Sequence, residues 1–148
     1  LWRQQLAAPT AGQRFAGAAQ SLVGVPFRLH GRCLVNGLDC VGLVAASLGR
    51  AGAKTVTTPS SYALRNRSID HLLGFARANG FAETNSPVWA GDLLLCAVSA
   101  AQFHLVICSP DRRSYIHAHA GLRKVVSTPG HLPWSPLKHW RLADLTGA

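Results

Sequence analysis

The segment "NGLDCVGLVAASLGRAG" occupies residues 36–52. A polar turn leads into Asp39 and Cys40, and an apolar, helix-favouring segment follows as far as Gly52. Asp is a typical N-cap and Gly typically follows a helix end, so the stretch predicts a helix over about residues 40–51. A thiol on the first turn of a helix faces unpaired backbone amides and the positive end of the helix dipole, which lower its pKa. We therefore predict that Cys40 is an activated nucleophile.

The chain contains three other cysteines, and none of them shares this setting. Cys33 lies in an expected loop, and Cys96 and Cys108 lie inside apolar runs where cysteine often serves as a small hydrophobe. No pair has CxxC spacing, which argues against a zinc ribbon. We expect four free thiols, and we expect iodoacetamide to label Cys40 before the other three.

The rest of the sequence predicts helices first and strands second. Short segments rich in strand-forming residues follow the helical part, separated by Ala-Ala, Pro-Asp-Arg-Arg and Gly breaks. This order indicates one α+β domain over residues 1–148 with an antiparallel sheet. The expected helices span 11–24, 40–51 and 68–80, a loop spans 53–68, and the expected strands span 91–99, 102–109, 114–120, 122–128 and 138–144.

Composition narrows the functional classes. The 148 residues are 48% hydrophobic and carry a net charge of +9, which favours anionic partners. The basic residues are scattered and are not interleaved with Trp, so nucleic-acid binding is not the expected function. No apolar run is long enough to span a bilayer. Residues 1–13 lack the charged start and apolar centre of a signal peptide, so we expect none in this chain.

A nucleophilic cysteine needs a base, and two predicted strands supply imidazoles. His104 stands alone on the otherwise apolar strand "FHLVI", and such a histidine needs a partner or a purpose. On "YIHAH", His117 and His119 share one face because side chains alternate along a strand. If the two strands are neighbours, His104 lies beside His117 or beside His119.

The sequence resembles the NlpC-type peptidoglycan endopeptidases, a group of papain-like cysteine peptidases. The resemblance covers about residues 12–127, and it implies a papain-like α+β fold in which the central helix carries the nucleophile and packs on the sheet. It places the nucleophile at Cys40, the general base at His104 and the orienting residue at His117, the histidine in the Ile-His-Ala register. It implies no cofactor and no metal. The matching segments are "LVGVPFRLHGR", "GLDCVGLVAASLGRAG", "AGDLLL", "FHLVICSP" and "YIHAHAGLRKVV".

The same resemblance assigns substrate-binding positions to Asp39, Phe27, Arg28 and Val41. The family's Asp can meet the amino group of the substrate, and Arg28 borders the expected cleft, where a stem-peptide carboxylate could reach it. Two positions depart from the family pattern, because Val41 stands where many members have Ser and Phe27 where many have Tyr. The implied substrate is a peptidoglycan stem peptide, with cleavage between γ-D-Glu and diaminopimelate.

The form "DCVGL" and the basic "FRLHGR" segment most resemble the phage-related branch of the family. Members of that branch are cell-wall peptidases encoded with the tails of phages and gene-transfer agents. The resemblance therefore implies action in the periplasm or at the cell wall, with phage-tail or gene-transfer-agent proteins as partners.

Three other functions compete with this interpretation. An inactive tail-tip or cell-wall-binding module of the same fold is one, and a nucleic-acid binder suggested only by net charge is another. A zinc amidase using His104, His117 and His119 is the third, but the sequence has no further ligand at a suitable spacing.

Overall fold

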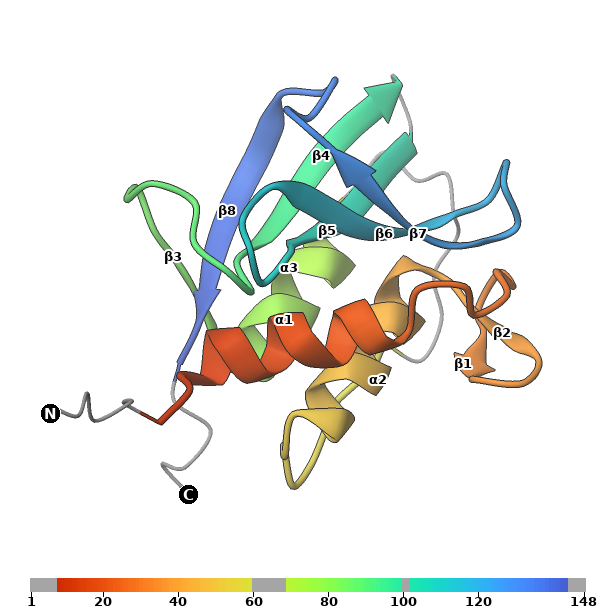
Figure 1. The fold of residues 1–148 in the computed structure, drawn as a ribbon, viewed down its shortest axis with the longest axis horizontal. Coiled ribbons are helices and arrows are strands. Elements are labelled where there is room, and N and C mark those ends of the chain that lie inside the picture. Colours follow the sequence, from red (N-terminus) through yellow and green to blue (C-terminus); the bar gives the residue numbers. More distant parts are fainter. Residues whose placement is uncertain (1–7, 60–68, 100–101, 144–148) are drawn as a thin grey trace, which may run out of the picture.

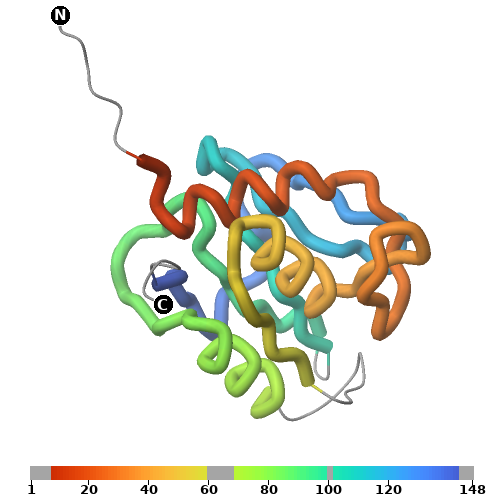
Figure 2. The backbone as a smooth tube through the Cα atoms, turned by 90° about the horizontal axis from the view of Figure 1, so that it is seen from below, coloured from red at the N-terminus to blue at the C-terminus, as the bar shows by residue number. Residues whose placement is uncertain are grey.

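The computed structural model describes residues 8–59, 69–99 and 102–143, and it confirms the α+β class. A six-stranded antiparallel sheet has the strand order β3-β8-β4-β5-β6-β7, and a separate two-stranded ribbon pairs β1 with β2. The three helices of these residues lie together on one side of the large sheet (Figures 1 and 2). No helix among the described residues is long and apolar enough to cross a membrane.

The helices lie close to where the sequence predicts them. Helix α1 (Ala11–Ser21) begins with a capping box in which Thr10 and Gln13 exchange side-chain and backbone hydrogen bonds. Helix α2 (Cys40–Arg50) begins after the predicted N-cap, Asp39. Helix α3 (Asp70–Ala78) ends before Gly80 as expected, and residues 60–68 of the predicted loop lie outside the described residues.

Five long strands confirm the predicted second half of the chain. The Ala-Ala break at residues 100–101, between β4 and β5, lies outside the described residues. The long strands are β4 (Leu93–Ser99), β5 (Gln102–Cys108), β6 (Ser114–His119), β7 (Lys124–Pro129) and β8 (Pro136–Leu142).

Three short strands were not expected from the sequence. They are β1 (Arg32–Cys33), β2 (Gly37–Leu38) and β3 (Phe81–Glu83). Strand β3 exists because it pairs with β8, where Phe81 opposes Leu142. Elements of two or three residues have no periodicity of their own, so only tertiary pairing defines them.

The main core fills the space between the helices and the sheet. Phe15 of α1 meets Phe81 of β3 edge to face at 5.4 Å between ring centroids, and Leu43 and Leu48 of α2 are buried with them. A smaller cluster, formed by Leu94, Cys96 and Val106 with Trp134 packed against it, is separate from this core. Strand alternation assigns neighbouring residues of β4 and β5 to the two clusters.

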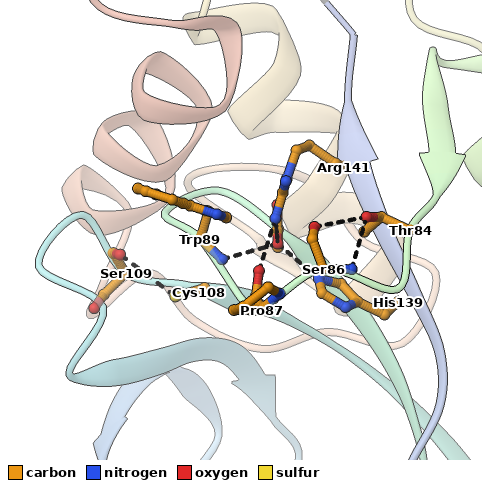
Figure 3. Close-up of polar contacts among 9 residues, drawn as sticks. Thr84, Ser86, Pro87, Trp89, Cys108, Ser109, His139 and Arg141 are labelled. Atoms are coloured by element: carbon orange, nitrogen blue, oxygen red, sulfur yellow. Dashed lines mark hydrogen bonds and ion pairs between the residues drawn. The ribbon is translucent and has the colours of Figure 1, made fainter.

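A buried carboxylate, that of Asp92, ties β8 to the start of β4, and Figure 3 shows its partners Trp89, His139 and Arg141. Asp92 accepts hydrogen bonds from the backbone amide of Trp89 at 2.9 Å and from Nε of Arg141 at 2.9 Å, and it lies 2.6 Å from Nε2 of His139. The side chain of Asp92 is only 1% exposed, so these partners compensate for its burial. This clamp is a structural feature, and none of its residues lines the cleft described below.

Candidate active site

A cleft opens where β5 and β6 separate. The two strands pair only at Ile107–Ile116 and Cys108–Tyr115, so their other ends diverge. The resulting cleft has a volume of about 110 Å³. Cys40 of α2 and His104 of β5, two residues that the sequence analysis singled out, both line it. Its lining residues are Phe27, Cys40, Val98, Gln102, His104, Ala118, His119, Ala120, Gly121 and Trp134.

Asp39 places the cysteine on the first turn of α2. Its Oδ1 accepts from the amide of Gly42 at 2.8 Å and from Nη1 of Arg32 at 3.0 Å, and its Oδ2 accepts from the amide of His30 at 2.8 Å. The predicted N-cap is therefore confirmed, and it also holds the preceding loop. Position 42 must be glycine, because a Cβ there would collide with the carbonyl oxygen of Gly31.

The predicted lowering of the Cys40 pKa is wrong for this structure. Burial, followed by the charge of Asp39, raises the pKa of the Cys40 thiol to about 12, although the backbone amides of Leu105 and Val41 hydrogen-bond the sulfur and act in the opposite direction. Cys40 is 7% exposed, so desolvation outweighs the effect of the helix amides. At neutral pH the site therefore holds a thiol and not a thiolate.

All four cysteines are free, as predicted, but exposure and thiol pKa favour Cys33 over Cys40 as the first to react. Cys33 is exposed, and hydrogen bonds from the backbone at Asn36 and Val35 lower the pKa of its thiol. Burial raises the pKa of Cys96 and that of Cys108 to about 11. Cys33 is thus the thiol that a soluble alkylating reagent meets first.

The structure brings His104 and His117 together. Nε2 of His104 lies 2.8 Å from Nδ1 of His117, and the rings meet at 85° with centroids 4.8 Å apart. On its other side, His117 forms a second hydrogen bond, in which its Nε2 lies 2.9 Å from Oγ1 of Thr128 on β7. Because Nε2 of His104 is used in this way, Nδ1 is the ring nitrogen left for a reacting group in the cleft.

Both rings are held neutral. Burial, and then repulsion from His117 and His119, lowers the pKa of His104 to about 3. Burial, and then His119, lowers the pKa of His117 to about 4. A neutral imidazole can accept a proton, so His104 is in the state that a general base requires.

His119, the rival for the orienting position, has a different place. It lines the cleft, but its Nδ1 accepts from the amide of Leu122 at 3.0 Å, and its ring centroid lies 5.7 Å from that of His117. It therefore does not supply the hydrogen bond that His117 makes to His104.

Sequence reasoning missed Trp134 and Thr128. The indole of Trp134 makes T-shaped contacts with the rings of His104 and His117, with centroids 5.7 and 6.0 Å away. Trp134 lies in an irregular segment just before β8, and Thr128 looks like any strand residue. No sequence signal identifies either of them as a neighbour of the histidines.

The four expected substrate-binding residues separate into two groups. Phe27 lines the cleft, held there by hydrogen bonds between its loop and the chain around β7, including Phe27 N to Arg123 O at 2.9 Å. Arg28 is exposed but is not among the lining residues. Val41 is fully buried in the core, and the carboxylate of Asp39 is used inside the fold. Of these four residues, only Phe27 lines the cleft and is accessible to a substrate there, whereas Val41 and Asp39 are buried and do not line it.

No group of three or more His, Cys, Asp or Glu side chains is arranged to hold a metal ion within residues 8–59, 69–99 and 102–143. Nε2 of His104 and Nδ1 of His117 bond to each other, while His119 accepts from the amide of Leu122.

Comparison with solved structures identifies the fold as that of NlpC/p60 domains. NlpC2 from Trichomonas vaginalis is 16% identical with a TM-score of 0.64 over 93% of this chain and 50% of that chain. The NlpC/p60 domain of the peptidoglycan hydrolase SagA is 18% identical with a TM-score of 0.62 over 88% of this chain and 98% of that domain. The peptidoglycan hydrolase RipB from Mycobacterium tuberculosis is 20% identical with a TM-score of 0.56 over 95% of this chain and 75% of that one.

The present chain thus spans about half the length of the Trichomonas protein. No known family profile matches the sequence, and no curated protein matches it. At these identities the structural likeness defines the fold, and the chemistry has to be argued from the cleft itself.

Proposed function

We propose that this protein is a cysteine peptidase that hydrolyses an amide bond in peptidoglycan stem peptides. The observation that carries the proposal is that Cys40 and His104 line one cleft, with His117 hydrogen-bonded to His104. A nucleophile, a base and an orienting group are the parts that acyl transfer through a covalent intermediate requires. The two neighbours described as peptidoglycan hydrolases support the choice of substrate class.

The protonation states favour general-base catalysis over a preformed ion pair. The Cys40 thiol transfers its proton to Nδ1 of His104 as sulfur attacks the peptide carbonyl carbon. His104 then gives that proton to the leaving amine as the C–N bond breaks, and afterwards activates a water molecule that hydrolyses the thioester. No cofactor and no metal takes part in this scheme.

The start of α2 supplies a donor for the oxyanion. The amides of Gly42 and Leu43 are bonded to Asp39, and the amide of Val41 bonds the sulfur. The amide of Cys40 itself is thus the helix donor best placed to meet the negative oxygen, as part of an oxyanion hole.

The bond between γ-D-Glu and diaminopimelate is the proposed site of cleavage. Its test is digestion of purified sacculi followed by mass spectrometry of the released muropeptides. We expect fragments that end in γ-D-Glu and new amino termini on diaminopimelate. Fragments cut between muramic acid and L-Ala would make the protein an amidase instead, and intact sacculi would contradict hydrolysis altogether.

We also propose that the enzyme acts in the periplasm or at the cell wall as part of a phage tail or gene-transfer-agent particle. The support is the "DCVGL" and "FRLHGR" resemblance alone. Detection of this chain by mass spectrometry in purified particles tests it, and its presence only in particle-free fractions would contradict it.

A second candidate is an inactive wall-binding or tail-tip module of the same fold. The buried Cys40 sulfur, with its pKa raised to about 12, is the observation that favours it. Such a module would sediment with sacculi and release no muropeptides, whereas the proposed enzyme releases them.

A further inference from the structure

Two hydrogen bonds in series connect the base to a hydroxyl group on β7. His104 Nε2 lies 2.8 Å from His117 Nδ1, and His117 Nε2 lies 2.9 Å from Thr128 Oγ1. The register explains the second contact, because Thr128 pairs with Tyr115 and therefore lies diagonal to His117 on the same face of the sheet. The series thus crosses from β5 through β6 to β7.

The directions of the two hydrogen bonds are linked, because each neutral imidazole carries one N–H. If His104 donates from Nε2, His117 must accept at Nδ1 and donate from its own Nε2 to the hydroxyl oxygen. If the hydroxyl donates to His117 Nε2 instead, His117 carries its hydrogen on Nδ1 and donates to His104 Nε2. The hydrogen of His104 must then be on Nδ1. In that second arrangement His104 cannot accept the proton of the Cys40 thiol.

Only the arrangement in which His104 donates from Nε2 to His117 can persist throughout the reaction. After His104 accepts a proton at Nδ1, its Nε2 still carries a hydrogen and still donates to His117, so neither ring has to turn. Thr128 is half-buried, and its hydroxyl hydrogen can rotate away from His117 while the oxygen accepts. A hydroxyl group that accepts from His117 therefore holds the base ready without any rearrangement.

We propose that Thr128 is a positioning residue that fixes the tautomers of His117 and His104 and keeps the lone pair of His104 Nδ1 directed at the cleft. The tautomer claim rests on the geometry alone. Its kinetic consequence rests on the proposed peptidase function.

The first test reads the tautomers directly by ¹⁵N NMR of the imidazole rings at neutral pH in the intact protein. We expect His104 and His117 to be protonated at Nε2 in the native protein and in Thr128→Ser. In Thr128→Val, which keeps the shape of the side chain and removes the acceptor, we expect a mixture of tautomers. The matched control is Ser127→Ala, which removes a hydroxyl from the same strand that bonds Ser114 and not a histidine.

A native spectrum with Nδ1 of His104 protonated, or a Thr128→Val spectrum identical to the native one, would overturn the proposal. This result needs no activity, so it decides the tautomer claim even if sacculi prove not to be the substrate.

The second test measures kinetics on the peptide that the digestion experiment identifies. Thr128→Val should lower kcat about tenfold with KM unchanged, the effect expected from one lost hydrogen bond. Loss of the acceptor also disfavours the imidazolium, so the acidic limb of the pH profile should move to lower pH. Thr128→Ser should restore both values, and a profile that does not move in Thr128→Val would assign Thr128 a purely structural role.

Discussion

At the scale of single residues, burial decides the chemistry of this site. Cys40 has the sequence context of an activated thiol, yet its sulfur is desolvated, and this raises its pKa to about 12. His104 is desolvated as well, which keeps it neutral and able to accept a proton. Both effects favour the same neutral pair, the Cys40 thiol and the His104 imidazole, because separated charges are costly in a poorly solvated cleft.

Alkylation tests whether burial outweighs the helix amides in setting the reactivity of Cys40. Iodoacetamide at neutral pH should modify Cys33 first, because Cys33 is exposed and hydrogen bonds lower its pKa, and Cys40 should react more slowly. Peptide mapping by mass spectrometry over a time course gives the order. Modification of Cys40 ahead of Cys33 would show that the helix amides outweigh burial.

Single-residue signals in the sequence indicated Cys40 and His104, because each has a local reason to be notable, whereas the choice of His117 over His119 came from the family resemblance. A thiol next to an N-cap and a histidine alone in an apolar strand are visible without coordinates. Thr128 and Trp134 carry no such signal, because their roles come from contacts across strands and loops. The burial of Val41 follows from helix packing, which a family comparison at one position does not reveal.

At the scale of elements, the start of α2 combines two tasks. Asp39 caps the helix and also holds the loop that contains His30 and Arg32. The start of α2, which carries Cys40, and the loop leading toward Phe27 are therefore fixed by one carboxylate.

Asp39→Ala should lower the free energy of unfolding by roughly 2 kcal/mol, since it removes an N-cap and leaves the His30 amide and the Arg32 guanidinium without this acceptor. Urea denaturation followed by circular dichroism measures the loss. The matched control is Glu83→Ala, which removes an exposed carboxylate that pairs with Lys138 at 3.0 Å, and it should change stability by less than about 0.5 kcal/mol. Equal losses in both variants would contradict the role assigned to Asp39.

The longer elements were predictable because they have their own periodicity and caps. Helices α1 and α2 and strands β4 to β8 lie within a few residues of the expected ranges. The separation of β5 from β6, which creates the cleft, was not predictable, because it depends on where their hydrogen-bonded register ends.

At the scale of the whole molecule, the buried histidines link stability to pH. The pKa of His104 is about 3 and that of His117 about 4 in the folded protein, against about 6.5 for an unperturbed histidine. Below pH 6.5 the unfolded chain therefore binds more protons at these groups than the folded chain does. Their contribution to stability is complete above pH 6.5 and declines as the pH falls toward 4 and 3.

This linkage predicts a melting temperature that decreases between pH 6.5 and pH 4. His104→Gln should show a weaker decrease over the same range, because one of the two groups has been removed. Differential scanning calorimetry of both proteins at matched ionic strength gives the comparison. Parallel curves for the two proteins would contradict a neutral, buried His104.

The central claim is that the sulfur of Cys40 forms the covalent intermediate with His104 as its base. The most direct measurement is the initial rate of muropeptide release from sacculi by Cys40→Ala, with Cys33→Ala as the matched control. We expect no release above background for Cys40→Ala, a folded protein by circular dichroism, and a native rate for Cys33→Ala. Release by Cys40→Ala at the native rate would show that the Cys40 sulfur is not the nucleophile.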